Sequence, residues 1–248
     1  SRCAAAISAL RWRNSRARPI WSPMTDTLQL ALFLVPGLII AIVFHEVAHG
    51  LVARWLGDPT AHEQKRLSLN PLRHVDPVGT LLVPGALALA KGPVFGWAKP
   101  VPVDKRRLRN PRFGMVAVAA AGPAINLLLA LVGAVALGVA IGGAPAEGTQ
   151  SPWVQGLYLF LTINVFLAFF NLLPIPPFDG SHIVEGLLPS RLGAAYERLR
   201  PFGMALFAAL VLVTWFAPQW DVLGRTVGPP VDWLMGRYLS LSAAVAGA

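Results

Sequence analysis

The sequence predicts an α-helical polytopic membrane protein, with four to six transmembrane helices and a re-entrant, β-hairpin-like segment between the first and second spans. Of the 248 residues, 55% are hydrophobic and only 13% are charged, and the mean hydropathy is +0.57. Soluble domains carry about 25% charged residues, so this composition does not suit a surface in contact with water. The apolar residues also form blocks of about 20, the length of helix that crosses a bilayer.

The distribution of charge and the single cysteine exclude several classes of function and of metal site. The net charge is +9, and the basic residues fall between the apolar blocks, as they do in bilayer proteins. We therefore expect contact with a lipid bilayer and no nucleic-acid partner. Cys3 is the only cysteine, which leaves no disulfide framework and no thiolate metal cluster. Any bound metal must be held by nitrogen and oxygen atoms.

Residues 1–23 are expected to be an N-terminal extension outside the fold. Residues 1–22 contain five arginines and no acidic residue, and their apolar run is too short to span a bilayer. Two interpretations remain open: a targeting segment, or residues translated upstream of a natural start at Met24. The second is favoured, with these residues non-native or disordered, because the topology below puts this end on the side that should be poor in arginine.

The first half of the chain contains one span and one interrupted segment. Residues 28–56 form a nearly unbroken apolar block, the first span, and residues 57–77 form a polar surface loop. Residues 79–103 are apolar but hold eight glycines and prolines, which argue against a helix. Non-helical backbone at membrane depth must be covered by protein or a water cavity. We therefore predict a re-entrant segment that returns to its own side.

The second half of the chain supplies the other spans. Residues 114–143 are rich in alanine and glycine and form the second span, 153–173 form the third and 202–218 the fourth. Residues 228–247 are a weaker candidate for a fifth, since they include Asp232 and Arg237.

The basic loops predict the orientation of the spans. Loops 57–77, 104–112 and 190–200 carry the arginines and lysines and should face the cytoplasm, whereas the connector 144–152 has none and should face away. These assignments agree only if residues 79–103 return to the side from which they enter.

The sharpest chemical feature is the sequence His45-Glu46-Val47-Ala48-His49 within the first span. On a helix, residues i and i+4 lie one above the other, so both imidazoles can hold one metal ion. Glu46 then sits beside the first ligand, within reach of a metal-activated water. Three ionisable side chains inside an apolar span are costly and indicate a site.

A catalytic zinc site needs a third protein ligand. Asp179 is the strongest candidate, because it follows the third span in Pro-Pro-Phe-Asp-Gly, where prolines break the helix. Taken from the residues alone, Asp179 could also be an ordinary turn residue. His182 is the rival ligand, and His62 and His74 are weaker ones.

The motifs in order, HEVAHG, LSLNPLRHVDPVGT, GWAKPVPVD, AGPAIN and NLLPIPPFDG, resemble the site-2 protease family of intramembrane zinc metalloproteases. The resemblance covers residues 41–183 and is closest to the short bacterial type without a PDZ or CBS domain. It implies that residues 24–248 form a single transmembrane metalloprotease domain. It also implies that His45, His49 and Asp179 hold one Zn²⁺, that Glu46 is the general base, and that Asn126 helps to hold the scissile carbonyl.

The expected function is intramembrane proteolysis of the HExxH type, the hydrolysis of peptide bonds in or near transmembrane segments. The resemblance implies transmembrane protein substrates such as anti-sigma factors or signal-peptide remnants. It also implies a multi-pass protein of the bacterial cell membrane, with the active site toward the cytoplasm. The alternative is a metal-binding membrane transporter or sensor that uses the same ligands without hydrolysis. Glu46 discriminates between the two, because a transporter does not require a carboxylate that is not a ligand beside the first histidine.

Overall fold

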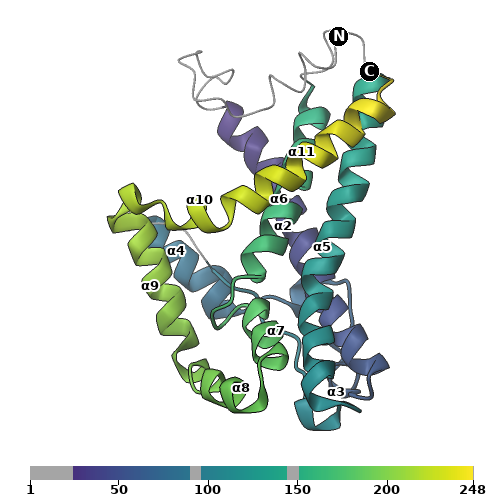
Figure 1. The fold of residues 1–248 in the computed structure, drawn as a ribbon. Coiled ribbons are helices and arrows are strands. Elements are labelled where there is room, and N and C mark those ends of the chain that lie inside the picture. Colours follow the sequence, from purple (N-terminus) through teal and green to yellow (C-terminus); the bar gives the residue numbers. More distant parts are fainter. Residues whose placement is uncertain (1–24, 90–95, 144–150, 248) are drawn as a thin grey trace. The chain divides into compact units, whose positions relative to one another are not determined.

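A computed structural model describes residues 25–89, 96–143 and 151–247, and these residues fold into helices without any β-strand (Figure 1). The α-helices are α2 (Thr25–Trp55), α3 (Thr60–Glu63), α4 (Val83–Leu89), α5 (Pro111–Gly142), α6 (Pro152–Asn171), α7 (Asp179–Leu187), α8 (Ser190–Glu197), α9 (Gly203–Phe216), α10 (Val222–Thr226) and α11 (Gly228–Val245). Short 3-10 or π-helical turns are η1 (Pro71–Arg73), η2 (Pro77–Leu82), η3 (Lys105–Arg107), η5 (Arg200–Phe202) and η6 (Pro218–Trp220). The predicted α-helical class is confirmed.

Four segments of the described chain are long and apolar enough to cross a membrane: Ala31–Trp55, Pro111–Gly142, Pro152–Asn171 and Ser190–Phe216. The first three match the predicted first, second and third spans. The fourth includes α9, which lies within the predicted span 202–218. The predicted fifth segment is a helix, α11, but it is not among the four.

The predicted β-hairpin-like form of residues 79–103 is not confirmed. Residues 77–89 are helical, as η2 and α4, while 96–104 have no regular structure and 90–95 lie outside the described residues. The position of the first proline explains part of the difference. Pro77 is the first residue of η2, where the missing N–H would have no helical acceptor, whereas Pro84 lies within the continuous helical stretch 77–89. Asp76 also caps η2, because its side chain accepts from the backbone N–H groups of Val78 and Gly79.

The described residues divide into two compact units. One comprises residues 25–41, 127–143, 151–166 and 230–247, and the other comprises residues 42–89, 96–126 and 167–229. In the first unit, α5 packs closely on α11: a β-carbon at Gly138 would lie 2.5 Å from the carbonyl oxygen of Ser242. The Ser242 hydroxyl in turn donates to the Ala134 carbonyl at 2.7 Å. Small residues allow this close approach of helices, as the alanine- and glycine-rich sequence of α5 predicts.

The second unit holds the residues that the sequence singles out. A buried core is formed by Ala53 of α2, Leu108 between η3 and α5, and Val118 of α5. At the start of α7, Phe178 packs edge-to-face against Phe170 of α6 and Phe207 of α9, with ring centroids 4.7 and 5.8 Å apart. These contacts fix the start of α7 from two directions.

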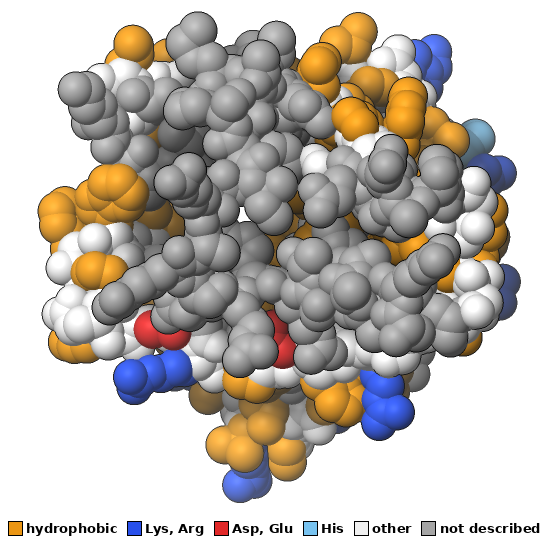
Figure 2. Space-filling model, turned by 90° about the horizontal axis from the view of Figure 1, so that it is seen from above, with side chains coloured by type: hydrophobic (Ala, Val, Ile, Leu, Met, Phe, Trp, Pro, Cys, Tyr) orange, Lys and Arg blue, Asp and Glu red, His pale blue; other side chains and the backbone are white. Residues whose placement is uncertain are grey.

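Large apolar side chains cover much of the outer surface of the long helices. Hydrophobic side chains are orange in Figure 2, where they lie mainly around the periphery of the view. Examples are Leu32 and Val35 of α2, Leu128, Val132 and Val139 of α5, and Leu212 and Phe216 of α9. Contiguous exposed apolar surface of this kind indicates an environment other than water, and lipid chains provide it. The protein is therefore a multi-pass membrane protein.

Candidate metal centre

The two histidines of the HEVAH motif lie one turn apart on α2, on the same face of the helix. Both side chains are buried, and the ring centroids are 4.6 Å apart with the ring planes at 85°. The four-residue spacing brings them together, as the sequence predicts. All the residues described in this site belong to the second unit.

Oxygen atoms from α5 fix the protonation of both imidazoles. Nδ1 of His49 lies 2.7 Å from the carbonyl oxygen of Val118, which can only accept a hydrogen bond, so Nδ1 carries the proton. Nδ1 of His45 lies 2.6 Å from Oδ1 of Asn126, and the same assignment follows. In a neutral imidazole with a protonated Nδ1, Nε2 presents a lone pair. This is the form in which histidine binds a metal, with its orientation set by the partner of the other nitrogen.

Asp179 brings a third acceptor to the same point. It is the first residue of α7, and its Oδ2 atom lies 3.1 Å from Nε2 of His45 and 3.4 Å from Nε2 of His49. Oδ2 is buried and makes no hydrogen bond. A buried carboxylate oxygen without a donor is costly.

A cation accounts for this convergence. The three ligand atoms lie within 4.8 Å of one another, and they form a group of metal-ligating type among the described residues. Two imidazole nitrogens and one carboxylate oxygen match a catalytic zinc site, which has three protein ligands and one open position. The residues therefore fit the zinc that the sequence predicts.

Gly122 leaves the space beside the histidines. A β-carbon at this position of α5 would lie 2.5 Å from Nε2 of both His45 and His49. The next residue, Pro123, lies inside the helix and cannot donate to the carbonyl one turn earlier. The α5 backbone thus approaches the Nε2 atoms of both histidines at a position that leaves no room for a side chain.

Glu46 is half-buried and is held by the irregular segment 96–104. Its Oε2 atom accepts the backbone N–H of Val101 at 2.8 Å. Arg66 anchors this segment, because its guanidinium donates to the carbonyl of Lys99 at 2.6 Å. Asp58, which is fully buried, accepts the N–H of Asp104 at 2.7 Å at the other end. The carboxylate of Glu46 is thus oriented by a segment that the histidine motif does not include.

The other predicted ligands do not join the metal group. His182 faces Arg200, whose guanidinium lies 2.9 Å from both of its ring nitrogens. His74 is buried, and its Nε2 lies 2.8 Å from the carbonyl of Ser68. His62 is exposed on α3.

Two contributions to this site carry no signal in the sequence. The Val118 carbonyl is a backbone group, so no residue type indicates it. Arg66 lies in a basic loop whose charges resemble those of any cytoplasmic loop. Gly122 belongs to the AGPAIN motif, which marks the segment but not the close approach of its backbone to the histidines.

Comparisons with known proteins agree with this chemistry. Residues 137–214 match Peptidase family M50, a stretch that includes Asp179. Three relatives carry the name "Putative zinc metalloprotease". YwhC of Bacillus subtilis is 40% identical over 74% of this chain and 81% of its own length. Rip2 of Mycolicibacterium smegmatis is 26% identical over 87% and 78%. A Methanocaldococcus jannaschii protein is 34% identical over 58% and 64%. No solved structure matches the chain.

Proposed function

Because the chain belongs to peptidase family M50, the site-2 protease family, and is an intramembrane zinc metalloprotease, we propose that His45, His49 and Asp179 hold its zinc and that Glu46 is its general base. The observation that carries the ligand assignment is the convergence of two imidazole Nε2 atoms and one buried carboxylate oxygen without a hydrogen-bond donor. The enzyme is on this proposal of the HExxH type.

A zinc ion at this site supplies Lewis acidity to the scissile carbonyl and to the attacking water. Residues of the chain transfer the proton and orient the reacting groups. Glu46 takes a proton from the water as it attacks the carbonyl carbon, and returns it to the leaving amine nitrogen. The hydrogen bond from the Val101 N–H limits the rotation of the Glu46 carboxylate, which supports this role.

In this proposal Asn126 has two roles. Its Oδ1 accepts the Nδ1 proton of His45, which supports a role in orienting that ligand. Family membership implies, in addition, a contact between its amide N–H group and the scissile carbonyl. The two roles use different atoms of one side chain and can be separated by substitution.

The enzyme acts on membrane-embedded substrates in a lipid bilayer. We infer that these are single-span regulators such as anti-sigma factors, or signal-peptide remnants. The carbonyls of a transmembrane helix are held in internal hydrogen bonds, so the substrate must unwind locally before water can attack. The basic loops 57–77, 104–112 and 190–200 support an active site toward the cytoplasmic side of a bacterial cell membrane.

The alternative, a metal transporter or sensor, is not favoured. The relatives of this chain carry metalloprotease names. The three candidate ligand atoms also form one compact group, whereas a transporter needs ligands arranged along a path. A transporter also has no use for an oriented carboxylate that is not a ligand.

Glu46→Gln tests the proposal. The purified protein in detergent is assayed for cleavage of a single-span reporter and for zinc content, beside Glu63→Gln, which removes an exposed carboxylate paired with Arg107. We expect wild type and Glu63→Gln to cleave, and Glu46→Gln to keep about one zinc per chain but to lose at least ~10³-fold in kcat. Cleavage by Glu46→Gln at the wild-type rate would exclude Glu46 as the base. Loss of zinc in that variant would make Glu46 a ligand instead.

A further inference from the structure

We propose that Glu185 is a positioning residue for the metal centre, which acts through Asp179 by fixing the helix that both residues share. The inference rests on the proposed function, since it takes Asp179 as a zinc ligand. Asp179 begins α7, and Glu185 lies six residues later on the same nine-residue helix. The distance between them along the helix axis is about 9 Å. A displacement of the distal half of so short a helix moves its first residue as well.

Glu185 is held by cations from two other elements. Its Oε1 accepts from Nζ of Lys105 in η3 at 2.9 Å, and its Oε2 accepts from the guanidinium of Arg200 in η5. Only 10% of the Glu185 side chain is exposed, and the flanking cations hold the pKa of its carboxyl below the ordinary value despite the opposing effect of burial. A buried carboxylate with two cationic partners is fixed in place more firmly than an exposed ion pair.

Arg200 contacts α7 at a second residue, His182. Its guanidinium also lies 2.9 Å from the ring nitrogens of His182, one turn before Glu185. Burial and the neighbouring Arg200 lower the pKa of His182 to about 4, so this ring is neutral near pH 7 and can accept from the guanidinium. Arg200 therefore contacts two successive turns of α7.

The far end of α7 is tied to the helix that orients the zinc histidines. Nε of Arg112, at the start of α5, donates to the carbonyl of Gly186 at 2.7 Å, and its guanidinium also donates to Leu188. A β-carbon at Gly186 would lie 2.2 Å from Cγ2 of Val116, so α7 lies directly on α5 there. Because α5 also supplies the oxygen atoms that bond His45 and His49, the seating of α7 on α5 sets where Asp179 meets them.

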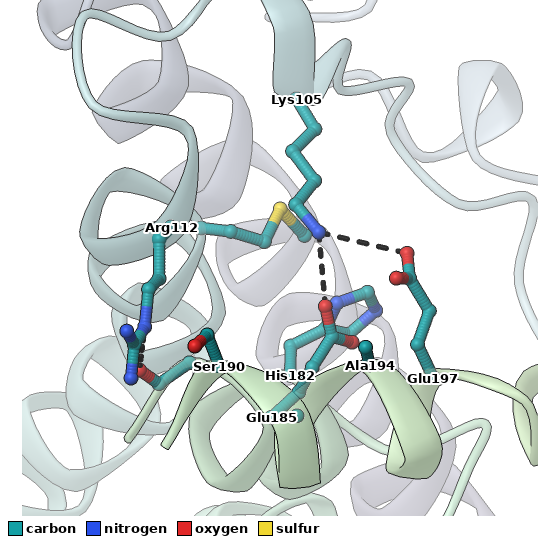
Figure 3. Close-up of a pocket in the computed structure, with 10 residues that line it drawn as sticks. Lys105, Arg112, His182, Glu185, Ser190, Ala194 and Glu197 are labelled. Atoms are coloured by element: carbon teal, nitrogen blue, oxygen red, sulfur yellow. Dashed lines mark hydrogen bonds and ion pairs between the residues drawn. The ribbon is translucent and has the colours of Figure 1, made fainter. Parts of the chain in front are cut away.

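Ionic contacts also hold α7 at a cavity of about 200 Å³, which is lined by η3, the start of α5, α7 and α8 (Figure 3). Lys105 reaches across the cavity, with Nζ between the carboxylates of Glu185 and Glu197. The Glu197 contact is longer, 3.6 Å, and Glu197 is half exposed on α8. At this cavity, the ionic contacts of Glu185 add to the packing of Phe178 and the hydrogen bonds of Arg112 in fixing the position of α7.

The test compares Glu185→Gln with Glu197→Gln. Both variants remove one carboxylate from the same lysine, but only Glu185 lies on α7 and contacts Arg200. We expect Glu185→Gln to weaken zinc binding about 10-fold, the lower end of the effect of residues that orient metal ligands. We expect kcat on the reporter to fall with KM within about twofold, and the visible absorption bands of the Co²⁺-substituted protein to shift. Glu197→Gln should change none of these.

A double-mutant cycle separates positioning from general stabilisation. In an Asp179→Ala background, Glu185→Gln should cause no further loss of zinc affinity, because Glu185 acts through Asp179. A further 10-fold loss in that background would overturn the proposal. So would equal zinc affinity and an equal Co²⁺ spectrum in Glu185→Gln and Glu197→Gln.

Two further controls keep the result interpretable. If Glu185→Gln does not fold, Lys105→Met removes one of the two partners of Glu185 and should weaken zinc binding in the same direction by a smaller factor. Unchanged zinc affinity and an unchanged Co²⁺ spectrum in Lys105→Met would then overturn the proposal. The proposed function fails separately, if the wild-type protein itself binds no zinc or if Asp179→Ala binds zinc as tightly as wild type.

Discussion

Gly122 of α5 lies against His49 of α2: a β-carbon on Gly122 would stand 2.5 Å from Nε2 of the imidazole. Gly122→Ala should therefore push both histidines from their positions without adding any polar group. We expect the variant to lose at least ~100-fold in reporter cleavage, since displacements of about 1 Å in a catalytic group have this effect. Its zinc affinity should fall as well, and both quantities are measured on protein purified in detergent.

Gly236→Ala is the matched control for this substitution. Gly236 also lies inside a helix, α11, and nothing stands within 4 Å of where its β-carbon would be. Alanine in place of a helical glycine is otherwise neutral or stabilising. Full zinc binding and cleavage by Gly122→Ala would mean that the close approach of α5 to the histidines is not part of the metal site.

The hydrogen bond from Val101 to Glu46 predicts a different kinetic effect. Val101→Pro removes the backbone N–H, while Pro102 already restricts residue 101 to extended conformations that proline can adopt. We expect kcat to fall about 10-fold, because Glu46 loses the donor that orients it, with zinc content unchanged because the ligands are untouched.

Val101→Ala provides the comparison for that experiment, because it shortens the side chain and keeps the N–H. It should retain most of the activity. If both variants lose the same activity, the packing of the Val101 side chain is responsible and the hydrogen bond to Glu46 is not. Loss of zinc in Val101→Pro would indicate a disturbance of α2 itself.

The local part of the site could be predicted from the sequence, and the distant part only by resemblance. The spacing of His45 and His49 sets their geometry through the helix repeat, which needs no knowledge of the fold. Asp179 lies 130 residues after His49, and from the residues alone it was the strongest candidate for the third ligand but could also have been an ordinary turn residue. Its approach to within 3.1 Å of His45 depends on how α7 packs on α5, which leaves no periodic pattern in the sequence.

The interrupted segment after the first span shows a second limit of prediction from the sequence. Counting glycines and prolines predicted a hairpin-like form, yet residues 77–89 are helical: Pro77 is the first residue of η2, and the helical stretch continues through Pro84. Proline is tolerated at the start of a helix, so the number of prolines alone overstates the interruption. Lys105, Glu185 and Arg200 show the same limit for charges: each is unremarkable in its own loop or helix, and only the fold brings them together.

Asn126 offers two atoms for two roles, and two substitutions separate them. Its Oδ1 lies 2.6 Å from Nδ1 of His45, so Asn126→Ala should weaken zinc binding about 10-fold, by removing the acceptor that orients the ligand. Asn126→Asp keeps an oxygen acceptor and should keep its zinc. It lacks the amide N–H assigned to the scissile carbonyl, however, and kcat should fall about 100-fold, as when one oxyanion donor is removed. Zinc content and single-turnover cleavage of the reporter measure the two effects separately. Wild-type kcat in Asn126→Asp would leave Asn126 with the orienting role alone, and wild-type zinc affinity in Asn126→Ala would remove that role, because His45 would then hold its position without the acceptor.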